Sequence, residues 1–185
     1  MSMSAVRLSH GGTGAPLSMK GRPMKALPLS RLLHENMAIV VTFVFSQQSL
    51  AELASRRFRG EWKYLWKFLY EIPATNAIRA CLEIALLLRL IDDAEGIADY
   101  LKEMDEYHER TFGCVHRADG TTDKLLMRDL TNKIIHALDL EWDLSSPSAP
   151  MLICLAPPEQ QAKFGWKRAE INIISLMAFA AGLMS

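Results

Sequence analysis

Residues 77–92 constrain the fold more than any other segment, because almost every position in them is apolar. The apolar side chains cover all sides of a helical wheel: Ile78, Leu82, Ile84, Ala85, Leu86, Leu87, Leu88, Leu90 and Ile91. A helix that is apolar all round has to be buried among other elements, so this segment predicts the central core helix of a mainly α-helical fold. Its charged residues are costly to bury unless they are paired, and the four-residue spacing of Arg79 and Glu83 predicts an ion pair.

Residues 1–26 differ in composition from the rest of the chain. They hold four glycines and two prolines, a composition that does not form a packed core. We therefore predict a disordered leader over residues 1–26. The chain has 185 residues, half of them hydrophobic, which is enough for one substantial core and too little for a second full domain. Residues 27–185 are thus expected to form a single helical domain.

Helices are predicted on both sides of the core helix. Ser30 can cap a helix that continues to about Leu53, and residues 61–71 place tryptophan and leucine at the spacing of a short amphipathic helix. Pro73 is expected to end that helix, because proline lacks a backbone donor and its ring clashes with the preceding turn. The acidic stretch that ends at Glu109 has the composition of a solvated helix.

The C-terminal half adds a hairpin and a last helix. Residues 113–122 contain an Asp-Gly pair and are predicted to form a loop, after which Asp123 can cap a helix. Residues 139–144 alternate with period two and residues 151–156 form a compact apolar run, and together they predict a β-hairpin. The apolar stretch over residues 166–184 predicts a helix. The expected architecture is a helical bundle with a small appended β-hairpin and a C-terminal apolar helix.

Charge and cysteine content limit the classes of function. The 21 basic residues are balanced by 21 acidic ones, so no global positive field holds a nucleic-acid backbone, and any such contact has to use a local basic patch. The three cysteines, Cys81, Cys114 and Cys154, are widely spaced and indicate free thiols in the reducing cytoplasm. The apolar run over residues 37–45 is too short for a transmembrane helix and is interpreted as a buried core segment, and we expect no membrane contact.

A polar stripe, Arg128-Asn132-His136, runs along an otherwise apolar helix. The residues expected on the buried face of this helix are Leu126, Leu130 and Ile134. Each step of four residues advances about 40° beyond a full turn, so His136 lies about 12 Å along the axis from Arg128. Because side chains lean toward the helix N-terminus, Arg128 points away from His136. Two such helices packed antiparallel across a dimer would place Arg128 of one chain near His136 of the other.

The segments Arg128-Asp129 and Asn132-Lys-Ile-Ile-His136 resemble the motif of the HEPN superfamily. Members of this superfamily are compact helical bundles that commonly dimerise and often cleave RNA without a metal. The sequence Leu86-Leu-Leu-Arg89 is similar to the preceding core helix of that group, and the likeness in helix order covers residues 30–140. Seven residues separate Arg128 from His136, more than the family usually has. The resemblance implies a homodimeric, metal-independent endoribonuclease that needs no cofactor. It also implies a role as a toxin or anti-phage effector with a cognate antitoxin or defence-system partner.

Arg128, Asn132 and His136 are the catalytic candidates that this resemblance implies. A histidine side chain titrates at about pH 6.5, so it can take the proton from a ribose 2′-hydroxyl or give one to the leaving oxygen. An arginine nearby stabilises the negative charge on the reacting phosphate, and Asn132 would orient the histidine or bind a phosphate oxygen. The alternative is a catalytically inactive interaction or dimerisation module. In that module Asn132 and His136 make structural hydrogen bonds and Arg128 is solvated.

Arg56, Arg57, Arg59, Lys63 and Lys67 form the densest basic cluster of the sequence. Aromatic residues are interleaved with them, a mixture that can bind phosphates and stack bases. The cluster is therefore the candidate RNA-binding surface. The alternative interpretation is a solvated face above buried aromatic side chains.

Two further groups carry metal-ligand chemistry. Asp139, Glu141 and Asp143 share one side of a predicted strand, where carboxylates can hold a divalent cation or face solvent at a strand edge. His108, Cys114 and His116 supply zinc-type ligands, but a structural zinc site normally has four, and the sequence offers no convincing fourth. No metal site is therefore predicted.

Overall fold

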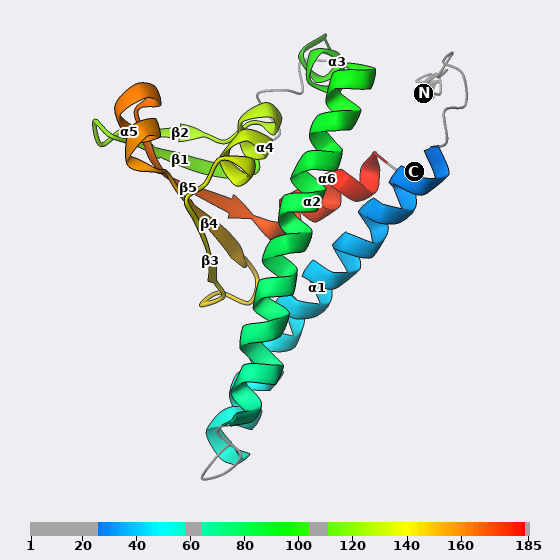
Figure 1. Ribbon diagram of the computed structural model, residues 1–185, viewed down its shortest axis with the longest axis vertical. Helices are drawn as coiled ribbons and strands as arrows, with labels where there is room; N and C mark the ends of the chain where they lie inside the picture. Colours follow the sequence, from blue (N-terminus) through cyan, green and yellow to red (C-terminus); the bar gives the residue numbers. More distant parts are fainter. Residues whose placement is uncertain (1–25, 58–63, 104–110, 184–185) are drawn as a thin grey trace, which may run out of the picture.

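The computed structural model describes residues 26–57, 64–103 and 111–183, so the predicted leader lies almost entirely outside the described residues. In this part of the chain a layer of helices packs on one face of a five-stranded antiparallel sheet (Figure 1). Helices make up 65% of the described residues, which confirms the mainly helical prediction. The predicted hairpin, however, is not an appendage of the helices, because its strands belong to this larger sheet.

The helical layer is built on a long hairpin of two helices. Helix α1 covers Ala26–Arg57, a π-helical turn η2 covers Lys67–Glu71, and helix α2 covers Ile72–Glu95. Ser30 lies inside α1 rather than at its start, so the predicted cap is wrong. The predicted break at Pro73 is also wrong. Pro73 comes just after the π-helical turn η2, where the altered hydrogen-bond pattern accommodates a residue without an N–H, and η2 runs directly into α2.

Helix α2 is the predicted core helix, with one correction. Ile84 and Leu88 are completely buried, whereas Leu86 and Leu90 are 55% and 53% exposed on another face. The predicted ion pair between Arg79 and Glu83 is present at 3.7 Å on the exposed side. The helix therefore has a solvent face in spite of its apolar sequence.

The sheet combines the predicted hairpin with three strands that the sequence analysis did not find. Its strand order is β2-β1-β5-β4-β3. The strands are β1 Gly113–Arg117, β2 Thr122–Lys124, β3 Asp139–Asp143, β4 Met151–Leu155 and β5 Trp166–Asn172. Strands β3 and β4 pair antiparallel, as predicted. The predicted loop over residues 113–122 is instead mostly β1 and the turn to β2, and the predicted helix over residues 166–184 begins with β5.

Four shorter helices complete the described chain. They are α3 Ile97–Glu103, α4 Met127–Ile135, α5 Pro158–Phe164 and α6 Ile173–Gly182. Helix α3 begins the predicted solvated helix, whose remainder to Glu109 lies outside the described residues. The predicted cap at Asp123 is wrong, because Leu126 occupies the N-cap position of α4. Asp123 belongs to β2, where its Oδ2 lies 2.6 Å from the Nε of Arg117.

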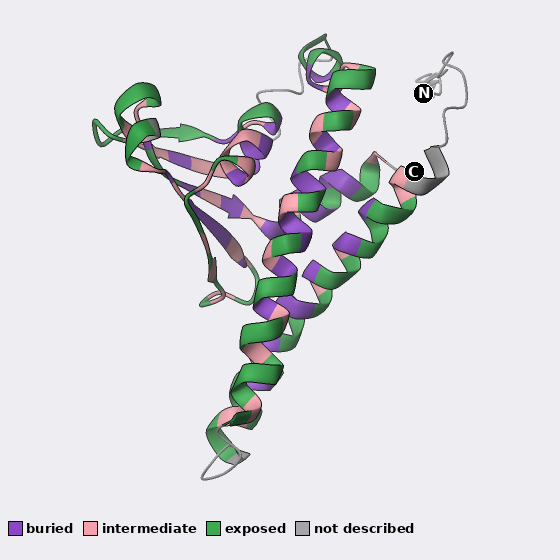
Figure 2. Ribbon diagram, viewed as in Figure 1, coloured by how far each residue is buried: buried purple, intermediate pink, exposed green. Residues whose placement is uncertain are grey.

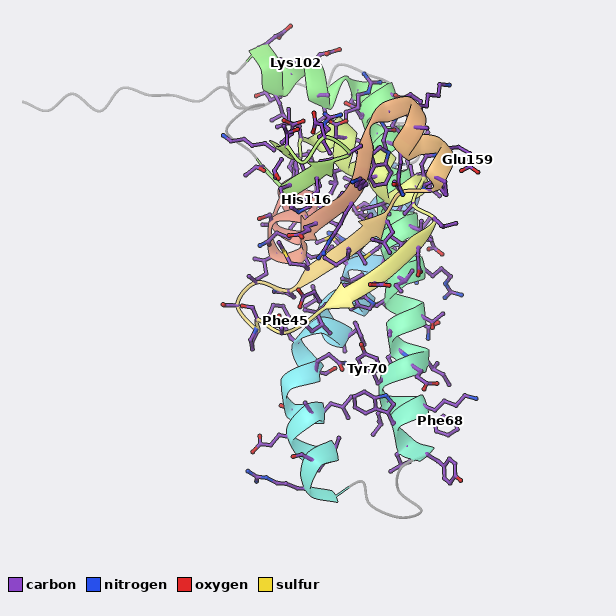
Figure 3. All side chains as sticks on the ribbon, turned by 90° about the vertical axis from the view of Figure 1, so that its left-hand side faces the viewer. Phe45, Phe68, Tyr70, Lys102, His116 and Glu159 are labelled. Atoms are coloured by element: carbon purple, nitrogen blue, oxygen red, sulfur yellow. The ribbon has the colours of Figure 1, made fainter. Side chains whose placement is uncertain are left out.

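The core lies between the helices and one face of the sheet. Alternate strand residues such as Leu152 and Ile171 are completely buried there, and the facing sides of the helices are buried with them (Figure 2). Within the described part of the chain, no helix covers the opposite face of the sheet (Figure 3). Gly113 fixes how closely β1 and β5 approach, because its φ of 137° and the carbonyl oxygen of Glu170 leave no room for a Cβ.

No single helix of the described residues is both long and apolar enough to cross a membrane. Within α1, the segments Leu29–Gln47 and Ser49–Arg56 satisfy that criterion only when they are taken together, and a bend of 44° separates them.

Candidate functional site

The polar stripe lies on α4, and the structure divides its three residues between two environments. Arg128, in the first turn of α4, places its Nε 3.4 Å from Oδ2 of Asp92 and its Nη2 3.1 Å from Oδ1 of Asp93. The Asp92 side chain is only 3% exposed, and its Oδ1 accepts a hydrogen bond of 2.7 Å from the backbone N–H of Ala98. Arg128 thus joins the start of α4 to the last turn of α2.

Asn132 makes a second connection between the same two helices. Its Oδ1 accepts a hydrogen bond of 3.0 Å from Nη1 of Arg89. The Nε of Arg89 also lies 3.2 Å from the carboxylate of Asp93, which Arg128 shares. We call these five residues the α2–α4 tie: Arg89, Asp92, Asp93, Arg128 and Asn132. Two of the three predicted catalytic residues are therefore engaged in holding α4 against α2.

His136 is exposed at the C-terminal end of α4, where its backbone N–H caps the helix by bonding to the carbonyl oxygen of Asn132 at 3.0 Å. Its side chain lines an open cavity of about 520 Å³. The other lining residues are Arg117, Asp129, Asn132, Lys133, Phe164 and Trp166. Arg128 is not among them, so within one chain the cavity brings His136 together with a different arginine, Arg117. Helix geometry predicted this separation of Arg128 from His136.

Two cationic side chains give the cavity its electrostatic character. The ammonium of Lys133 lies 4.6 Å from the centre of the Trp166 ring. Burial lowers the pKa of Lys133, and the charge of Arg117 adds to this effect while that of Asp129 opposes it. The guanidinium of Arg117 is fixed by Asp123 at 2.6 Å, and its Nη1 donates a longer bond of 3.4 Å to the carbonyl oxygen of Phe164. Both cations are therefore positioned before any ligand binds.

The sequence analysis missed Arg117 and Lys133. Lys133 belongs to the segment Asn132-Lys-Ile-Ile-His136 and directly follows Asn132 of the polar stripe. Arg117 comes from β1, which the sequence analysis assigned to a loop. Phe164 completes the rim with a side chain that is 54% exposed. Two cations, a histidine, an amide and an exposed aromatic ring form a combination that can hold a phosphate group and stack a base.

The two described members of the predicted basic cluster, Arg56 and Lys67, lie at the other end of the molecule. Arg56, near the end of α1, pairs with Glu52 at 2.8 Å, and Lys67 is on η2 at the far end of the helical hairpin from α4 (Figure 1). The side chain of Arg57 lies outside the described residues, as do Arg59 and Lys63 entirely. The structure does not bring the described members of this cluster to the cavity beside His136.

A second, apolar cavity of about 380 Å³ lies between α1, η2 and the β3–β4 connection. Phe45 and Tyr70 contribute to its lining and lie below the sheet in Figure 3. Among the described residues that line it there is no histidine, cysteine, carboxylate or basic side chain. This cavity is therefore poorly equipped for acid–base chemistry or for binding phosphate.

The described residues of the two groups that carry metal-ligand chemistry lie on the sheet. Asp139, Glu141 and Asp143 are exposed on β3, an edge strand of the sheet. Hydrogen bonds from Ser145 occupy the carboxylate of Asp143 and hold its pKa below the usual range. Cys114 and His116 lie on β1, while the third residue considered with them, His108, is outside the described residues. For the three carboxylates of β3, the geometry therefore favours solvent-facing side chains at a strand edge over a cation site.

No protein-family model, curated protein or solved structure matches this chain. The functional interpretation therefore rests on the chemistry of the described residues.

Proposed function

We propose that the protein is a metal-independent endoribonuclease of the HEPN kind and that RNA binds in the cavity beside His136. One observation carries this proposal: an exposed histidine shares an open cavity with two fixed cations, Arg117 and Lys133. A phosphodiester needs such cations to bind, and its cleavage needs an acid–base group within reach of the same phosphate.

The chemistry uses the RNA's own 2′-hydroxyl as nucleophile. Its oxygen forms a new bond to phosphorus, the bond from phosphorus to the 5′-oxygen breaks, and one proton moves from the 2′-oxygen to the leaving oxygen. His136 serves as an acid–base group in this transfer, and Arg117 and Lys133 stabilise the charge that develops on the phosphate oxygens. Phe164 offers a surface on which a neighbouring base can stack.

Arg128 and Asn132 have a different role in this proposal from the one the sequence suggested. Their bonds to Asp92, Asp93 and Arg89 make them positioning residues, which fix α4 and through it His136. Arg128 does not line the cavity and is not expected to touch the reacting phosphate, whereas Asn132 also lines the cavity and can contact it.

A homodimer in the cytoplasm fits this activity. Each cavity contains one histidine among its lining residues, whereas cleavage is most efficient when one group removes a proton and another supplies one. A second chain can bring its own His136. The three cysteines are free thiols, in keeping with a reducing compartment. An enzyme that cleaves cellular RNA has to be restrained, and a cognate antitoxin or defence-system partner would do so.

Cleavage of single-stranded RNA in the presence of EDTA tests the proposal. We expect wild-type protein to cleave, and His136→Ala to lower the rate by about 10²–10⁴-fold, the usual contribution of an acid–base group. His34→Ala is the matched control, because His34 is an exposed histidine on α1 away from the cavity and its loss should leave the rate unchanged. RNA that stays intact across a range of pH, or equal rates for wild type and His136→Ala, would remove the basis of the proposal.

A second candidate function is a catalytically inactive interaction module, and two observations favour it. The α2–α4 tie gives Arg128 and Asn132 a structural role, and Leu86 and Leu90 expose apolar surface at four-residue spacing on α2, where a partner helix can pack. Sedimentation of Leu86→Glu/Leu90→Glu beside an Arg31→Glu control, which reverses the charge of an exposed, glutamate-paired arginine on α1, separates the two functions. The interaction module is supported if Leu86→Glu/Leu90→Glu no longer self-associates and the wild type has no RNase activity.

A further inference from the structure

The sheet face that carries no helix holds a compact cluster of chemically reactive side chains. Strands β1 and β5 pair so that Cys114 is opposite Glu170 and His116 is opposite Arg168. Side chains two residues apart on a strand point to the same side, so Cys114 and His116 share this face with Glu170. Figure 3 looks onto the face and shows His116 there on β1. The three residues are all half-buried.

The atoms that can bind a metal lie close together. Sγ of Cys114 is 3.6 Å from Nε2 of His116 and 3.8 Å from Oε2 of Glu170. Nε2 of His116 is 3.1 Å from Oε1 of the same carboxylate. The three ligand atoms all lie within 4.8 Å of one another. Of the described residues, only these form a histidine, cysteine and carboxylate group of this kind.

We propose that Cys114, His116 and Glu170 bind one zinc ion. Bond lengths of about 2.3 Å to sulfur and about 2.1 Å to nitrogen and oxygen, at tetrahedral angles, separate sulfur from either lighter atom by about 3.6 Å. The same geometry separates nitrogen from oxygen by about 3.4 Å. The sulfur–nitrogen distance equals the expected one. The two distances to the carboxylate involve different oxygens, Oε2 for sulfur and Oε1 for nitrogen, and each lies within a few tenths of an ångström of the expected value. A rotation of the Glu170 carboxylate that presents one oxygen to both other ligands therefore admits the ion.

The surrounding residues orient two of the three ligands. Nδ1 of His116 lies 3.3 Å from Oγ1 of Thr122 on β2. A proton on Nδ1 that is donated to this hydroxyl leaves the lone pair of Nε2 directed at the metal. Nη2 of Arg168 lies 3.1 Å from Oε1 of Glu170, which leaves Oε2 as the oxygen nearer to Cys114. Partners of this kind are usual behind zinc ligands, where they fix the tautomer and the orientation.

The ligand set selects the metal. Calcium and magnesium bind oxygen ligands almost exclusively, whereas a thiolate, an imidazole and a carboxylate suit zinc. Burial and the neighbouring Glu170 raise the pKa of the Cys114 thiol in the absence of metal. Zinc therefore binds with release of one proton from sulfur. Three protein ligands leave the fourth tetrahedral position for a water molecule.

This site is separate from the cavity beside His136. It uses none of the residues that line that cavity, and the proposed RNA cleavage proceeds without metal. Zinc binding and RNA cleavage can thus be tested independently, and failure of one leaves the other standing.

Titration of the metal-stripped full-length protein with Zn²⁺ against a chromogenic chelator tests the inference. We expect one zinc ion per chain, and a loss of affinity of at least about tenfold for each of Cys114→Ser, His116→Ala and Glu170→Gln. Glu141→Gln is the matched control, because Glu141 is also a strand glutamate on the open sheet face. It pairs with Ile153 of β4, and Ile153 pairs in turn with Glu170 of β5. The zinc affinity of Glu141→Gln should equal that of the wild type.

Substitution of Co²⁺ for Zn²⁺ identifies the sulfur ligand. We expect a thiolate-to-cobalt absorption band in the wild type and its disappearance in Cys114→Ser. Circular dichroism of each metal-free variant verifies that it is folded. An absence of stoichiometric zinc binding would overturn the inference, as would folded Cys114→Ser and His116→Ala variants that bind zinc as tightly as the wild type.

Discussion

Replacement of Arg128 by methionine separates a structural role for this residue from a catalytic one. The substitution keeps most of the aliphatic volume and removes the charge that faces Asp92 and Asp93. Loss of one partner from a fully buried ion pair costs about 3–5 kcal/mol, whereas an exposed pair is worth less than about 1 kcal/mol. Asp92 is 3% exposed and Arg128 is 44% exposed, so this pair falls between the two cases. We expect a loss of about 2 kcal/mol in the free energy of unfolding.

Urea and thermal denaturation followed by circular dichroism measure this loss. For a domain of this size 2 kcal/mol lowers Tm by about 4–8 °C. Arg79→Met is the matched control, because Arg79 is a helical arginine paired with a glutamate at 3.7 Å on an exposed face. Its effect should stay below about 0.5 kcal/mol. A double-mutant cycle with Asp92→Asn isolates the energy of the pair itself.

Two results would refute the reasoning. If Arg128→Met unfolds at the same urea concentration as Arg79→Met, the α2–α4 tie does not hold α4 in place. If Arg128→Met is fully stable and yet abolishes RNA cleavage, Arg128 acts on the substrate and the structural assignment is wrong.

The remaining predictions concern the cavity, the strand pairing and the thiols. The pKa of Lys133 is lowered in the folded protein. Between this lowered pKa and the ordinary lysine pKa, the unfolded chain therefore binds more protons than the folded protein does. The stability of the wild type relative to Lys133→Met should therefore rise with pH across this window, as measured by urea denaturation, and a fall would contradict the assignment. Gly113→Ala should cost on the order of 2 kcal/mol in thermal denaturation, because a Cβ collides with the backbone of Glu170; an unchanged Tm would contradict the close approach of β1 and β5. Cys114 should react first with a thiol reagent in the native protein, since burial raises the pKa of Cys154 to about 12, and faster labelling of Cys154 would contradict its burial.

Local sequence patterns predicted those elements whose signals lie within a few residues of one another. The hairpin of β3 and β4 could be recognised because Asp139, Glu141 and Asp143 alternate with apolar residues, and β4 is a compact apolar run. The core helix was found from its mostly apolar sequence, and the helix of the stripe from its apolar periodicity. Each of these signals is contained in a single segment of fewer than twenty residues.

Strand β5 escaped prediction for a physical reason. Its burial does not alternate strictly, because Lys167 and Arg168 are both exposed near a register irregularity between His116 and Arg117. Besides β4, the strand pairs with β1, which is more than fifty residues earlier in the chain, as the pairing of Cys114 with Glu170 shows. Such a pairing leaves no local pattern in the sequence, and without β5 the sheet itself could not be foreseen.

The same limit applies to the two candidate sites. The sequence pointed to Asn132 and His136, which come from one helix, but the cavity also needs Arg117 from β1 and Phe164 from α5. Likewise Cys114 and His116 were noticed as ligand types, and Glu170 joins them only through the β1–β5 pairing. Both sites are completed by residues that are distant in the sequence and meet only in the folded protein. The spacing of residues along the chain does not reveal such a meeting.

The rate of RNA cleavage in EDTA by wild type, His136→Ala and Arg117→Met tests the central claim most directly. We expect metal-independent cleavage by the wild type to products that end in a 2′,3′-cyclic phosphate, with large losses of rate in both variants and native circular dichroism spectra throughout. Cleavage that persists undiminished in His136→Ala, or that requires a divalent cation, would contradict the assignment of the cavity beside His136 as the active site.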